Sequence, residues 1–377
     1  MAPQLPVELL RAVVDNFRLP PFSSQRRTEE LEKEVRCTLY SLSLTSRVLR
    51  EIAQPLLYNF IRVQRRRNAE TLSLLVDQGS KNGALSSTRT IVFERPGVEE
   101  EETYFGDSAY LLNEVPTLLS ALEQLIISSN LWSLHKFNRS SLSRVFLNGI
   151  DLDTMSISGL IFPSLEFVAL YSVTLRFGPL PATSFPKLRR FAFDKDELAD
   201  EDAATLTALA PQMDSITLMS DIFRDALSDL PTLPLARTLV NLPWHWIEEV
   251  RPAESSTVNV RLLVCDIFSE KESHCTGYLD SFASLLKTTR EFASLESLYL
   301  PPSSSLSPNF RTNEIITSME NVALAAKDRN IEVIFEEQSN QLRGECQVSE
   351  EFMRRMTERK ITREVEEEKQ AGRESGG

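Results

Sequence analysis

Cysteine, histidine and long apolar runs are all scarce in this chain of 377 residues. The four cysteines, Cys37, Cys265, Cys275 and Cys346, are irregularly spaced, and no positively charged segment leads an apolar stretch at the N-terminus. A secretory signal is therefore not expected, and the thiols should be reduced and buried. The apolar runs are far shorter than the roughly 20 residues of a membrane helix. These absences predict a soluble protein of the cytoplasm and/or nucleus with no membrane partner.

The same scarcity leaves little material for a metal or catalytic site. His274-Cys275 and Cys265 form the best metal-like group, but the second ligand pair of a structural zinc site is missing. The chain also lacks a G-x-S-x-G turn, a glycine-rich phosphate loop and an H-E-x-x-H motif. We therefore expect no catalytic residue, no metal and no cofactor, and we do not expect an enzyme.

Positive charge is also in deficit, with 41 lysines and arginines against 54 acidic residues and a net charge of −13. Proteins that bind nucleic acids present a basic face to the phosphates, so a nucleic-acid partner is not expected. The hydrophobic content of 42% is sufficient for a large core, and the length suggests two or three domains.

Apolar residues at helical spacing predict three short helices near the N-terminus. The first should run from Pro6, which is favourable in a first turn, to about Phe17. Thr28 is expected to cap the second helix and Ser46 the third, which should end near Pro55. So much apolar surface cannot be buried within these helices alone. It requires either a partner or the rest of the chain.

Three motifs occur in order along these helices. Leu5-Pro6-x-Glu-Leu-Leu comes first, S-L-x-x-x-S-R-x-x-R follows from Ser41, and I-A-Q-P-L-L-Y runs from Ile52 to Tyr58. Together they resemble an F-box, the helical module by which substrate receptors bind the Skp adaptor of cullin-RING ubiquitin ligases. Two features depart from that family: an insertion over 18–36 separates the first two helices, and Tyr58 stands where many members have tryptophan.

The resemblance implies an Skp adaptor and a cullin as partners. It places the adaptor contact on residues of both halves of the module, some of which must instead form the module's own core: Leu5, Pro6, Leu9, Leu10, Val13, Leu42, Leu44, Val48, Ile52, Leu56 and Leu57. The alternative interpretation is a helical cap over the end of a repeat array, which also needs apolar faces.

From about residue 88 onward the pattern L-x-x-L-x-L recurs. It begins at Leu122, Leu142, Leu165, Leu188 and Met213 at intervals of roughly 20–25 residues, and it returns at Leu295. Phe-Pro-x-Leu introduces two of these segments. The pattern resembles a degenerate leucine-rich-repeat solenoid, although 225–290 fits it poorly. We expect the array to close with a helix over 312–329 and a strand over 331–335.

Strand side chains alternate between two faces, so the residues between the repeat leucines should share the second, concave face. We expect Arg144, Phe146, Phe167 and Arg190 to lie exposed there in one stripe as candidate target contacts. Arginine and aromatic residues are common anchors of interfaces. The alternative is that the phenylalanines pack beneath loops and the arginines are merely solvated.

More than half of the residues over 350–377 are charged, which predicts a disordered or frayed-helical tail. The sequence thus indicates an α/β chain with an F-box-like module over 1–60, a repeat array over 61–345 and a charged tail over 346–377. Two functions follow as hypotheses. The chain is either a non-catalytic substrate receptor of an SCF-type ubiquitin ligase, or a repeat scaffold for protein interactions without a ligase.

Overall fold

The computed structural model describes residues 6–18, 29–63, 84–94, 119–128, 134–138, 141–194, 199–218, 239–243, 259–263, 272–288, 295–306 and 311–337. The chain divides into two compact units, Met1–Ser129 with Gly344–Gly377 and Asn130–Arg343. Both units combine helices with parallel strands, so the predicted α/β class is confirmed. No described helix is both long enough and apolar enough to span a membrane. The predicted tail over 346–377 lies outside the described residues.

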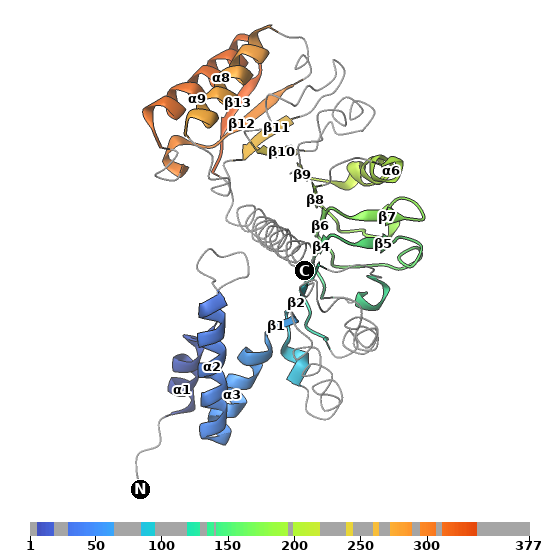
Figure 1. Cartoon of the computed structure of the whole chain (residues 1–377), viewed down its shortest axis with the longest axis vertical. Helices are drawn as coiled ribbons and strands as arrows, with labels where there is room; N and C mark the ends of the chain where they lie inside the picture. The colour runs from blue at the N-terminus through green and yellow to red at the C-terminus, as the bar shows by residue number, and fades with distance from the viewer. Residues whose placement is uncertain are drawn as a thin grey trace, which may run out of the picture. The chain divides into compact units, whose positions relative to one another are not determined.

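The first unit begins with three helices, α1 (Val7–Asp15), α2 (Glu29–Thr45) and α3 (Arg47–Tyr58) (Figure 1). Val14 of α1, Val35 and Leu39 of α2 and Ala53 of α3 form their common core. Val35 and Leu39 lie one turn apart on α2, and the half-buried residues packed around this core follow the same helical spacing, so each helix buries one stripe. The three predicted helices are therefore present.

The third helix does not end near Pro55, as the sequence predicted, but continues to Tyr58. Proline has no N–H to donate to the preceding turn, and this loss normally ends or kinks a helix. In α3, however, Ile52, Leu56 and Leu57 pack against the helical core on both sides of Pro55. Their burial holds the last turn in place.

Three parallel strands follow in the same unit: β1 (Phe60–Val63), β2 (Thr90–Glu94) and β3 (Gln124–Ser128), with the 3-10 turn η1 (Ala84–Ser87) before β2. Their registers align Ile61 with Ile91, and Ile91 with Leu125. The first unit therefore contains these three strands as well as the three helices. Only Asn59 separates α3 from β1, and its carbonyl oxygen accepts hydrogen bonds from the N–H groups of Arg89 and Thr90 at the start of β2.

Among its described residues the second unit has eight parallel strands in one sheet, each paired with the next along the chain: β4 (Arg144–Asn148), β6 (Phe167–Tyr171), β8 (Arg190–Asp194), β9 (Ser215–Leu218), β10 (Leu239–Pro243), β11 (Asn259–Leu263), β12 (Ser297–Leu300) and β13 (Glu332–Phe335). A separate parallel pair joins β5 (Asp151–Asp153) to β7 (Thr174–Arg176). Parallel neighbours need a crossover, and short helical segments supply it in several connections.

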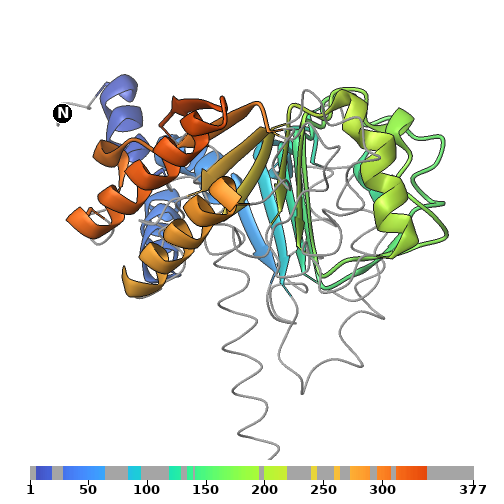
Figure 2. The same ribbon diagram turned by 90° about the horizontal axis from the view of Figure 1, so that it is seen from above.

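These helical segments are η3 (Leu134–Phe137), η4 (Ala182–Ser184), α6 (Asp200–Leu209), η5 (Ala210–Gln212), α8 (Glu272–Thr288), η8 (Ser303–Ser305) and α9 (Asn313–Asp328). The two longest, α8 and α9, lie side by side (Figure 2). The predicted closing helix and strand are both present as α9 and β13. Thr312 caps α9, and Asn330, with a φ of 61°, ends it in a left-handed turn whose N–H donates to the Lys327 carbonyl oxygen.

The core of the second unit is built from the repeated pattern itself. Register aligns Val145 with Val168, Phe191 and Ile216, and each of these side chains is buried. The two Phe-Pro-x-Leu segments meet as well. The rings of Phe162 and Phe185 stack with centroids 5.5 Å apart, and the Phe162 N–H donates to the Ser184 carbonyl oxygen at 2.8 Å. The phenylalanine ring that precedes the strand of one repeat therefore packs on the corresponding ring of the next repeat.

Candidate protein-interaction sites

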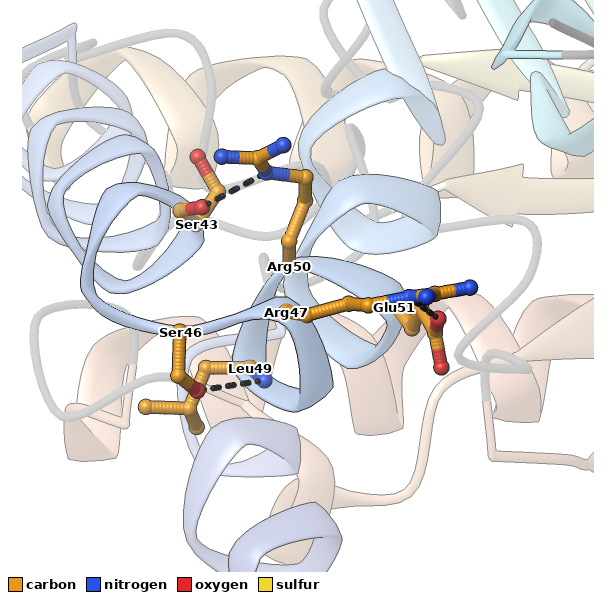
Figure 3. A network of polar contacts seen from close by, with 6 residues as sticks. All are labelled: Ser43, Ser46, Arg47, Leu49, Arg50 and Glu51. Carbon is orange, nitrogen blue, oxygen red and sulfur yellow. Dashed lines mark hydrogen bonds and ion pairs between the residues drawn. The ribbon is translucent and has the colours of Figure 1, made fainter.

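The junction of α2 and α3 is fixed by Ser46 and Arg50 of the S-L-x-x-x-S-R-x-x-R motif (Figure 3). The Ser46 hydroxyl accepts a hydrogen bond from the Leu49 N–H at 3.2 Å, which satisfies one of the free donors in the first turn of α3. Arg50 Nε donates to the Ser43 carbonyl oxygen at 3.0 Å, near the C-terminus of α2. A backbone N–H at the start of α3 and a backbone carbonyl at the end of α2 therefore both have side-chain partners. The predicted cap at Ser46 is confirmed.

Replacing Ser46 by alanine is expected to destabilise the helical module by about 1 kcal/mol, because the Leu49 N–H loses its acceptor. The expected readout is faster amide hydrogen exchange across the first turn of α3. Replacing Ser41, which donates to the Cys37 carbonyl oxygen in the middle of α2, is the matched control. Equal exchange in the two variants would contradict the capping role.

The predicted adaptor contacts separate into two groups. Leu5 lies outside the described residues. Leu10, Leu42, Ile52, Leu56 and Leu57 are half-buried, and all of these except Leu10 pack against the helical core. Pro6, Leu9, Val13, Leu44 and Val48 are exposed. Some of the predicted contacts therefore form the inside of the module, and the others remain available to a partner.

We call Leu9, Val13, Leu44 and Val48 the exposed apolar residues of the module. Leu9 and Val13 are one turn apart on α1, with 54% and 57% of their surfaces exposed. Leu44 is 61% exposed at the end of α2, and Val48 is 39% exposed at the start of α3. Sequence reasoning missed Val7 and Tyr40, which are also exposed. The signal for Tyr40 was its position one helical turn before Leu44.

A buried charge cluster joins α2 to β1 within the same unit. Arg62 Nη2 of β1 lies 3.1 Å from Glu32 Oε1 of α2, and both side chains are only 8% exposed. Arg36 Nη2 donates to the Phe60 carbonyl oxygen at 2.7 Å, and the guanidinium groups of Arg36 and Arg62 both lie over the Phe60 ring. Burial lowers the pKa of Arg36, while Glu32 acts in the opposite direction. The cluster fixes the helices to the first strand.

The predicted stripe on the second unit is brought together, but its exposure differs from the prediction. Phe146 and Phe167 are 2% and 1% exposed, so the expectation that both rings face solvent is wrong. Their centroids lie 5.1 Å apart in an edge-to-face arrangement, and the Arg190 guanidinium covers the Phe167 ring at 5.3 Å. Large aromatic rings on adjacent strands remove more surface from water by packing on each other. Arg144 and Arg190 remain partly exposed.

A polar row continues across later strands of this face. Register places Thr217, Asn241, Arg261 and Tyr299 side by side on β9 to β12. Asn241 Nδ2 donates to Thr217 Oγ1 at 3.1 Å, and the Arg261 guanidinium lies over Tyr299 and pairs with Glu336 Oε2 at 2.5 Å. Sequence reasoning missed Asn241 and Arg261 of this row because they lie in 225–290, which fitted the repeat pattern poorly.

Within the described part of the chain, no three histidine, cysteine, aspartate or glutamate side chains gather closely enough to hold a metal ion. Cys275 is buried in α8, and Cys265 lies outside the described residues. No protein-family model matches the sequence, and no curated protein matches it. Interpretation of the two surfaces therefore rests on their own chemistry.

Proposed function

We propose that this chain is a non-catalytic substrate receptor that binds the Skp adaptor of an SCF-type ubiquitin ligase through α1 to α3. The observation that carries the proposal is the set of exposed apolar residues, Leu9, Val13, Leu44 and Val48, beside a helical core that is already filled. Burying one leucine or valine side chain contributes about 1.5–3 kcal/mol. Buried against an adaptor, these four residues would form the apolar centre of an interface.

The parallel strands have a separate role in this proposal. The repeated L-x-x-L-x-L pattern, the parallel neighbours and the stacked Phe-Pro-x-Leu segments support a degenerate leucine-rich-repeat array as the target-binding part. The chain itself breaks and forms no bond. It raises the effective concentration of a target near the ubiquitin carrier held by a cullin, in the cytoplasm or the nucleus.

Replacing Leu44 and Val48 together by aspartate is expected to abolish capture of purified Skp adaptor in a pull-down, lowering affinity by about a hundredfold or more. Two charges would have to be desolvated at the contact, whereas the free chain keeps both positions in water. The double variant should therefore remain folded by circular dichroism. If the double variant captures as much adaptor as the wild type does, the proposal is wrong.

Leu324 provides the control, because it is 56% exposed on α9 of the other unit. Leu324→Asp makes the same kind of change on a helix surface but should leave adaptor capture unchanged. Loss of capture in this control would show that the effect is general rather than local to the module.

A scaffold without a ligase is the second candidate, and the buried Glu32–Arg62 pair favours it. A helical cap on the end of a strand array requires close attachment of this kind between α2 and β1. Wild-type protein that is folded and captures neither adaptor nor cullin would support this scaffold over the receptor.

A further inference from the structure

Two arginines lie on one face of the second unit, although the chain as a whole carries a net charge of −13. Arg144 of β4 and Arg190 of β8 are aligned in register on either side of Phe167 of β6. Together with Phe146 and Asn148 of β4, these residues share one face because strand side chains alternate. We call this set the arginine face.

The guanidinium of Arg190 is held in place by the aromatic floor of this face. It lies over the Phe167 ring at 5.3 Å, and Phe167 is itself held by the Phe146 ring. A guanidinium held over an aromatic ring loses less freedom when it binds, and its planar fork of N–H donors matches a carboxylate. The two rings are buried, so the arginines, rather than the aromatic surface, are the groups presented to a ligand.

Two further groups on β4 are available to acceptors. Among the described residues the side chain of Arg144 has no hydrogen bond or ion pair. Asn148 is 6% exposed, and its buried Nδ2 has no hydrogen-bond partner in the structure. A buried amide donor without an acceptor is unfavourable and points to a ligand that supplies one. This observation is independent of the arginine charges.

We propose that the arginine face binds an acidic, extended peptide segment, with carboxylates on Arg144 and Arg190 and a carbonyl oxygen on Asn148. Arg144 and Arg190 are two strands apart, about 10 Å at the usual spacing of a sheet. Acidic residues three apart in an extended polyproline-II segment lie on the same side of the peptide and span about 9 Å at roughly 3.1 Å per residue. The segment belongs to the target, and in this respect the inference rests on the proposed function.

Fluorescence polarisation with the full chain tests this binding without any adaptor. The probe is a fluorescein-labelled peptide of about nine residues that repeats Glu-Ser-Ser, and the matched probes carry glutamine or lysine in place of glutamate. At a salt concentration of about 50 mM, where screening is weak, wild-type protein should bind the glutamate peptide and neither matched peptide. Equal binding of the glutamine peptide, or no binding of the glutamate peptide, would overturn the inference.

Arg144→Glu with Arg190→Glu should weaken binding of the glutamate peptide by about tenfold or more, because both contacts become repulsive. Lys187→Glu with Arg311→Glu changes the net charge equally at two exposed residues elsewhere on the same unit and should stay within about twofold of the wild type. If the first pair fails to fold by circular dichroism, Arg144→Gln decides, with an expected loss of about threefold or more. An equal loss in the control pair would refute a local site.

Two more measurements separate the alternatives. The first measures binding of a single-stranded oligonucleotide of matched charge. Binding that is tighter than that of the peptide, and that is lost in the Arg144→Glu, Arg190→Glu variant, would assign the face to nucleic acid and overturn the inference. In the adaptor pull-down the first pair should behave like the wild type. Peptide binding without adaptor capture by the wild type would reject the ligase role and keep the face; the reverse result would reject the face alone.

Discussion

Phe162→Ala is expected to destabilise the second unit by about 3–5 kcal/mol, the usual cost of removing a buried aromatic ring. Phe162 is fully buried and stacks on Phe185, so its loss leaves a cavity between two consecutive repeats. Because the chain has two units, hydrogen exchange of peptides covering β6 and β8 measures the effect locally. Faster exchange should appear in both strands.

Phe177 is the matched control, since it is 71% exposed in the same unit. Phe177→Ala should change stability by less than about 0.5 kcal/mol. The double variant of Phe162 and Phe185 adds a finer test, because stacked aromatic pairs are coupled by about 0.5–1.5 kcal/mol. Strictly additive losses would mean that the two rings do not support each other across the repeats.

Glu32→Ala should produce a loss of similar size, about 3–5 kcal/mol, in the first unit. The change removes the carboxylate that pairs with Arg62 in a buried cluster that also contains Arg36. Hydrogen exchange should accelerate in α2 and β1 together. Protection that changes in only one of these elements would show that the pair does not join them.

The exposed pair of Arg47 and Glu51 on α3 provides the comparison, with side chains 91% and 65% exposed. Surface pairs spaced four residues apart on a helix contribute only about 0.3–0.5 kcal/mol, so Glu51→Ala should have little effect. Replacing Glu32 and Arg62 together by methionine should recover much of the lost stability, because two buried apolar chains have no desolvation cost.

The helices and most of the repeat strands could be predicted because their signals are local. Apolar spacing and the serine at position 46 located α1 to α3, and the repeated leucines located β3, β4, β6, β8, β9 and β12. These patterns depend on residues within one turn or one strand. The prediction was wrong where tertiary packing outweighs a local rule. At Pro55, neighbouring residues that pack on the core keep α3 helical as far as Tyr58.

The polar contacts could not be predicted in the same way. The whole of α3 lies between Glu32 and Arg62 in the sequence, and no residue near either one predicts that they form a buried pair. The predicted exposure of Phe146 and Phe167 was wrong for a related reason, since alternation along a strand gives the face of a side chain but not what packs upon it. Long-range pairing decides both cases.

The charge cluster at β1 also bears on how such a module can be moved between proteins. A cut after residue 58 would carry Glu32 and Arg36 away on the helices and leave Arg62 and the Phe60 ring behind on the strand. Each fragment would then hold buried groups whose counterparts are missing, so neither could be transplanted intact. The smallest segment that keeps this cluster whole therefore extends at least through Val63. Recombination that preserves the fold should favour breakpoints after β1.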